Sequence, residues 1–150
     1  MWESECIERV RVLVNDLDTT QKYDDCRINR VLVVAASQLI QEIYFDVTYT
    51  VNISQATISP DPADDPRDET FLNLLSLKTA VLISNGEWRR LGGFSMRISD
   101  GPSTIDIGGA VEAAKNLYNM LNEQYEKEKL MQKFGKNGHA ITTPTTYWDV

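Results

Sequence analysis

Two helices are predicted from the hydrophobic spacing of the first 43 residues. The first helix covers residues 4–16. The second begins after Asp24, whose side chain can cap it while Tyr23 packs against Ile28 across the first turn. Eight apolar residues at helical spacing form a wide stripe on this second helix, which favours a central position in the core: Ile28, Val31, Leu32, Ala35, Ala36, Leu39, Ile40 and Ile43.

Two further helices are predicted in the second half of the chain. Asp65 and Pro66 are a cap and a favoured first helical residue, and helical spacing follows them up to the stop signal Asn85-Gly86. A long fourth helix is predicted over residues 109–134, with an inner face of spaced apolar side chains. Four helices of this length indicate a helical body.

Alternation of period two predicts β-structure in two places. Apolar residues alternate with polar ones from about 45 to 58, which indicates a strand pair inserted between the second and third helices. A β-hairpin arm is predicted over residues 94–107, with its turn at 100–103 and paired glycines at both ends. The side chains that this arm would present to a protein partner are Phe94, Met96, Arg97, Ile98, Ile105 and Ile107.

The predicted fold is therefore mainly α (α+β), with a four-helix bundle-like body. Residues 1–131 form this helical domain with its β arms, and residues 132–150 form an extended C-terminal tail. In the tail, Tyr147, Trp148 and Val150 follow a threonine-rich segment that has no core of its own. Tyrosine and tryptophan are favoured interface anchors, so they either fold back on the body or dock on another chain.

Composition and charge narrow the possible functions. The chain of 150 residues fits one domain, and its 42% hydrophobic and 25% charged content is ordinary for a globular protein. A net charge of −7 argues against binding duplex DNA, because affinity for DNA depends on cations that neutralise phosphates. The longest apolar run, residues 31–36, is too short to cross a membrane. Cys6 and Cys26 are interpreted as buried, reduced thiols.

Little in the sequence indicates catalysis or a cofactor. The only histidine, His139, lies in the tail without a predicted partner, and there is no phosphate-binding loop. Five carboxylates between residues 61 and 69 could hold a divalent cation. Their spacing matches no calcium-binding loop, however, and a solvated loop leading into a helix explains them better. No catalytic, cofactor-binding or metal-binding residue is predicted.

The order of these parts resembles the head–tail connector (adaptor, or head-completion) proteins of tailed bacteriophages. The resemblance extends over most of residues 4–131. It rests on the loop and helix at 16–36, the segments Tyr49-Thr50-Val51 and Ile58 to Pro62, the helix pattern at 71–80, and the hairpin before a long helix. None of these motifs is diagnostic alone.

The resemblance implies a structural virion protein without enzymatic activity, made in the host bacterial cytoplasm and located in the neck. Such a protein would form a homo-oligomeric, twelvefold ring beneath the portal protein. DNA would pass through the ring without specific binding. The C-terminal tail would dock on the portal, and the hairpin would contact a neighbouring subunit or the downstream neck or tail protein.

Three alternatives remain open from the sequence. A tail-completion or other neck protein would have similar size and composition but would not bind the portal. A cytoplasmic peptide-binding module would be a monomer with a groove. An enzyme that uses the acidic loop with a metal ion would be stabilised by that ion.

Overall fold

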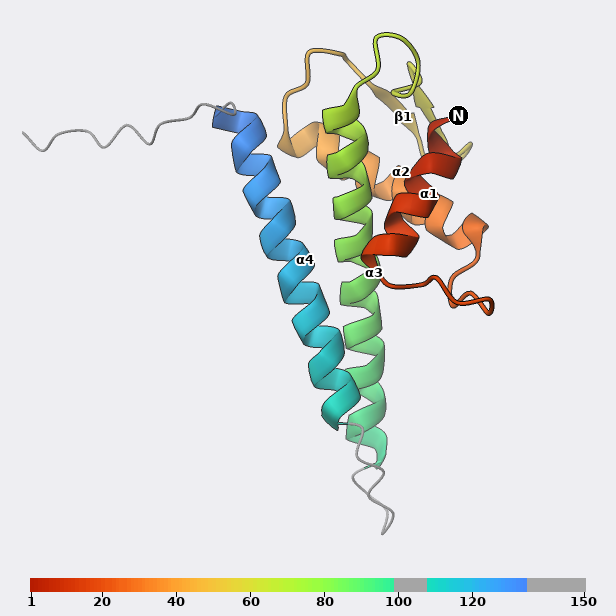
Figure 1. The fold of residues 1–150 in the computed structure, drawn as a ribbon, viewed down its shortest axis with the longest axis vertical. Helices are drawn as coiled ribbons and strands as arrows, with labels where there is room; N and C mark the ends of the chain where they lie inside the picture. Colours follow the sequence, from red (N-terminus) through yellow and green to blue (C-terminus); the bar gives the residue numbers. More distant parts are fainter. Residues whose placement is uncertain (99–107, 135–150) are drawn as a thin grey trace, which may run out of the picture.

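The computed structural model describes residues 1–98 and 108–134 of the chain (Figure 1). This part is mainly helical with one small antiparallel sheet, as the sequence predicts. Its elements in chain order are α1 (Trp2–Leu13), α2 (Asp25–Glu42), β1 (Thr50–Asn52), β2 (Thr57–Ser59), α3 (Glu69–Ile98) and α4 (Gly108–Phe134).

The third helix is the centre of the molecule. Helices α1, α2 and α4 all pack against α3, and α4 runs antiparallel beside it (Figure 1). A helix surrounded on several sides needs apolar residues all round, and the first half of α3 has them. Its fully or almost fully buried apolar residues are Phe71, Leu72, Leu74, Leu75, Leu77 and Ala80.

The predicted start of the second helix is confirmed in atomic detail. The Asp24 side chain accepts a hydrogen bond of 2.6 Å from the backbone N–H of Arg27. Tyr23 and Ile28 on either side of this cap are both buried. The first helix begins slightly earlier than predicted, because Trp2 is part of the core and only 2% exposed.

The strand pair is much shorter than the predicted 45–58 and ends one residue beyond it, at Ser59. Only three residues of each strand pair, with Val51 opposite Ile58. The earlier part of the alternation has a different cause, since Phe45 and Tyr49 point into the core from a loop. Their rings contact Phe71 at centroid distances of 5.1 Å and 4.1 Å, respectively.

The third helix begins three residues later than its predicted first position. Asp68, rather than Asp65, acts as the cap, and its side chain accepts a hydrogen bond of 2.9 Å from the N–H of Phe71. Pro66 therefore belongs to the turn before α3, which begins at Glu69. An aspartate does cap this helix, but the sequence offers both Asp65 and Asp68 as caps. The hydrogen bond from Tyr49 helps to place Asp68 in that position.

The prediction of a β-hairpin arm is wrong for its first strand. Helix α3 does not stop at Asn85-Gly86 but continues to Ile98. The predicted interface residues Phe94, Met96, Arg97 and Ile98 therefore lie in a helix, whereas Ile105 and Ile107 lie outside the described residues. The helix persists because α4 supplies an apolar partner here: Trp88 stacks on Tyr118 with ring centroids 5.6 Å apart.

Candidate interaction surfaces

Three groups of hydrogen-bonded polar side chains join helices and loops of the body to one another. The clearest case is Arg11, which is only 2% exposed. Its guanidinium donates to Asp16 at 3.0 Å, to the carbonyl of Tyr23 at 3.0 Å, and to Asp25. Asp16 also accepts from the backbone N–H of Lys22 at 2.8 Å and from that of Tyr23 at 3.2 Å. Arg11 therefore fixes the loop between α1 and α2.

A second group fastens that loop to α3. Glu87 accepts from Lys22 at 2.7 Å, from the hydroxyl of Tyr23 at 3.3 Å, and from Arg90 at 2.7 Å. The hydrogen bonds from Arg90 and Lys22 outweigh the effect of burial and lower the pKa of Glu87 to about 2. The carboxylate is charged and fully partnered. A cavity of about 220 Å³ lies next to Glu87, between this loop, α3 and α4. Because Glu87 already has its hydrogen-bond partners, its carboxylate is not available to a ligand in this cavity.

A third group joins the end of α2 to both long helices. Glu42 accepts from Lys78 at 2.6 Å and from the hydroxyl of Tyr125 at 2.7 Å, with Lys129 at 3.5 Å. Burial raises the pKa of Glu42, but these donors overcome it and leave the pKa below its usual value. Burial and the neighbouring carboxylate raise the pKa of Tyr125, so its hydroxyl stays protonated and donates.

The acidic loop at 61–69 is occupied with structural hydrogen bonds and ion pairs. Asp61 accepts from the N–H of Ala63 at 2.9 Å, and Asp68 caps α3 and accepts from Tyr49 at 2.9 Å. Glu69 pairs with Arg9 and Arg67. Among residues 1–98 and 108–134, no group of three or more potential ligands is placed to hold a metal ion.

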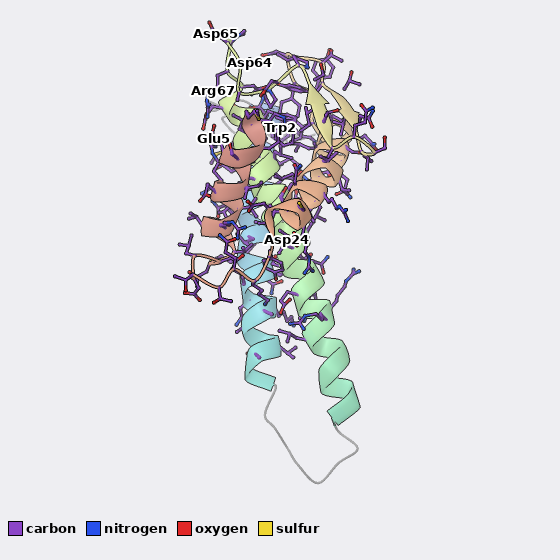
Figure 2. All side chains as sticks on the ribbon, turned by 90° about the vertical axis from the view of Figure 1, so that its right-hand side faces the viewer. Trp2, Glu5, Asp24, Asp64, Asp65 and Arg67 are labelled. Atoms are coloured by element: carbon purple, nitrogen blue, oxygen red, sulfur yellow. The ribbon has the colours of Figure 1, made fainter. Side chains whose placement is uncertain are left out.

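Figure 2 shows how this loop sits over the start of α1. Arg67 lies beside Glu5, with which it forms an ion pair, and Glu5 also accepts from Arg9 at 2.6 Å. These arginines lower the pKa of Glu5, with the hydrogen bond from Arg67 as the main cause. Asp64 and Asp65 point outward at the tip of the loop, apart from this network. These ion pairs hold the loop against the start of α1.

The cysteines do not form a pair. Cys6 is buried, as predicted, and burial raises the pKa of its thiol to about 11, which keeps it protonated and unreactive. Cys26 is exposed, so the prediction that it is buried is wrong. The apolar stripe of α2 starts at Ile28, and residue 26 falls on the opposite side of the helix.

Two features of the surface have no partner within the described part of the chain. The first is the distal half of the α3–α4 pair, which projects beyond α1, α2 and the sheet (Figure 1). The second is a set of exposed large apolar side chains on the outer side of α4: Met120 (57% exposed), Leu130 (51%), Met131 (42%) and Phe134 (72%). Single exposed apolar residues are common, but a series along one helix indicates a contact surface.

Sequence reasoning did not find the α4 surface, although its spacing of three, four and seven residues was a usable signal. The predicted docking residues Tyr147, Trp148 and Val150 lie outside the described residues, as does His139. Comparison with protein-family models, with curated proteins and with solved structures finds no match to this chain. None of the described helices combines the length and apolar character needed to span a bilayer.

Proposed function

We propose that this chain is a non-enzymatic structural subunit of the neck of a tailed bacteriophage, a head–tail connector. In this proposal, copies form a twelvefold ring beneath the portal protein, and DNA passes through the ring without specific binding. The subunits are made in the host bacterial cytoplasm and become part of the virion.

The observation that carries the proposal is the projecting α3–α4 pair. A monomeric domain gains little from a pair of helices that extends past its core, because there the two helices pack on each other and no third described element lies beside them (Figure 1). In a ring, neighbouring copies and the next component along the axis can cover that surface. The connection between the two helices, which includes Ile105 and Ile107, would then contact a neighbouring subunit or the downstream neck or tail protein.

Charge and chemistry support the same function. The net charge of −7 suits a channel through which DNA must slide. An acidic surface does not bind the DNA phosphates, because that binding depends on cationic side chains. The described acidic clusters around Arg11, Glu42 and Arg67 are used to hold elements together. The C-terminal residues Tyr147, Trp148 and Val150 are proposed to dock on the portal, as aromatic anchors commonly do at protein interfaces.

The test is electron microscopy of the purified protein mixed with the portal from the same genome. The full-length chain and a 1–134 truncation are compared. We expect a ring capping the portal with the full-length chain and none with the truncation. Rings with both chains would retain the connector and move its docking site from the tail to the helical body. A portal left bare by both would overturn the proposal in favour of a tail-side neck protein or a peptide-binding module.

A further inference from the structure

The outer side of α4 has a seven-residue repeat that faces solvent. Heptad positions a and d of this repeat are defined by the spacing of residues three, four and seven apart, which share one side of a helix. Every a and d residue from 113 to 134 is exposed. The a residues are Ala113, Met120, Lys127 and Phe134, and the d residues are Asn116, Glu123 and Leu130. We call these seven residues the α4 seam.

The charged residues of the seam lie at its centre. Within the described part of the chain, the side chains of Glu123 and Lys127 take part in no ion pair or hydrogen bond. Met120 and Leu130, one on each side, are 57% and 51% exposed. A charged residue at an a or d position lowers the stability of a helix pair but selects its register and orientation. The seam therefore has the features of a selective helix-pairing surface.

The sequence of the seam is complementary to itself only when reversed. In an antiparallel pair, a residues of one helix face d residues of the other. With a twofold axis beside residue 125, Met120 faces Leu130, Glu123 faces Lys127, and Asn116 faces Phe134. Each of these contacts occurs twice by symmetry. The two central layers then combine opposite charges, and the next layers combine apolar side chains.

A parallel pair of the same helices would be unfavourable. There each seam residue faces its own copy, so that Lys127 meets Lys127 and Glu123 meets Glu123. Like charges that oppose each other at an interface are strongly disfavoured. The charges of the seam thus favour the antiparallel arrangement and penalise the parallel one, which is how paired helices select an orientation.

We infer that a second copy of this chain binds along the α4 seam to form an antiparallel, twofold-symmetric dimer. All seam residues are exposed, whereas Leu121 and Tyr125 on the opposite side of the same helix are buried. The seam therefore faces away from α3, and Figure 1 shows no other described helix or strand beside α4 on that side. A twofold contact is closed and does not extend into a ring. The dimer is therefore a form of the protein separate from the proposed ring, and it does not depend on portal binding.

The test is a charge exchange, measured by sedimentation velocity of the full-length chain over a range of concentrations. We expect a reversible monomer–dimer equilibrium for the wild type. Glu123→Lys alone and Lys127→Glu alone should each raise the dissociation constant about tenfold or more, because each creates two like-charge contacts. The double variant Glu123→Lys/Lys127→Glu should dimerise like the wild type. Glu8→Lys, an exposed charge reversal on α1, is the matched control and should change nothing.

Mixing the two single variants gives the sharpest readout. Lysines at 123 and 127 in one chain would face glutamates at 127 and 123 in the other, so the mixture should form a heterodimer although neither variant dimerises alone. Circular dichroism of each variant checks that it is folded. A monomeric wild type at all concentrations would overturn the inference. So would single variants that dimerise like the wild type, or a mixture that remains monomeric.

The register is tested separately in a Cys26→Ser background, which removes the exposed native thiol. Chains with Met120→Cys and chains with Leu130→Cys are mixed under mild oxidation. We expect a disulfide between positions 120 and 130 of different chains. Linkage only between identical positions would indicate a parallel pair and overturn the inference. Failure of portal binding in the experiment above would leave all of these outcomes unchanged, because none of them uses the portal.

Discussion

At the scale of single residues, the buried guanidinium of Arg11 is the most consequential polar group. It neutralises Asp16, which is 7% exposed, and holds the carbonyl of Tyr23. These two groups thereby gain a partner in a site with little access to water. Neither its partners nor its burial follows from the local sequence, because the contacts form only when the loop after α1 turns back.

We predict that Arg11→Met lowers the free energy of unfolding by about 3–5 kcal/mol, because it leaves the Asp16 carboxylate buried without its counter-charge. Urea unfolding followed by circular dichroism measures this. Arg30→Met is the control: Arg30 is exposed on α2, and we expect a change within about 0.5 kcal/mol. An Arg11→Met variant as stable as the control would mean that water reaches Asp16 and that the pair contributes little.

At the scale of elements, the length of α3 is the main departure from the sequence-based prediction. Asn85-Gly86 resembles a helix stop, yet α3 passes through it. Space around Gly86 is open, with no atom within 4 Å of where a Cβ would lie. Glycine at this position is therefore a helix-interior residue that costs stability, rather than a cap that requires positive φ.

Gly86→Ala should accordingly raise the free energy of unfolding by about 0.4–1 kcal/mol, because alanine restricts the unfolded chain and favours the helix. Thermal and urea unfolding measure the change. Gly93→Ala, in a similarly open position of α3, should act in the same direction. Destabilisation by Gly86→Ala would support the predicted stop at this position and a shorter helix.

Comparison of the helix ends explains which elements were predictable. The Asp24 cap depends on contacts within four residues and was predicted correctly. The start of α3 was misplaced because Asp65 and Asp68 are both plausible caps, and the bond from Tyr49 helps to position Asp68. The predicted hairpin failed because alternation over a few residues does not exclude a helix when a partner such as Tyr118 is available. For the α4 seam, the sequence shows the spacing of the residues, but it does not show that this side of the helix is exposed.

At the scale of the whole molecule, α3 is packed against more elements in the body than in the distal helix pair. In the body, α3 is packed by α1, α2 and α4 together. Glu87 still binds the loop between α1 and α2, and the adjacent Trp88 stacks on Tyr118 of α4. Farther along α3, α4 is the one described element that lies beside it (Figure 1). Regions with fewer buried contacts open at lower free energy than the core, so the two parts should differ in local stability.

Native-state hydrogen exchange by mass spectrometry tests this division. We predict that amides of residues 88–98 and 108–118 exchange faster than those of residues 71–81, and that Trp88→Ala increases the first rate without changing the second. The ring stack joins the distal helices to each other and not to the body, so its loss should be felt locally. The exposed apolar substitution Val12→Ala serves as the control. An equal rise of the exchange rate in both regions would mean that the helix pair and the body unfold as one cooperative unit. The distal pair would then be an integral part of the core rather than an arm available to a partner.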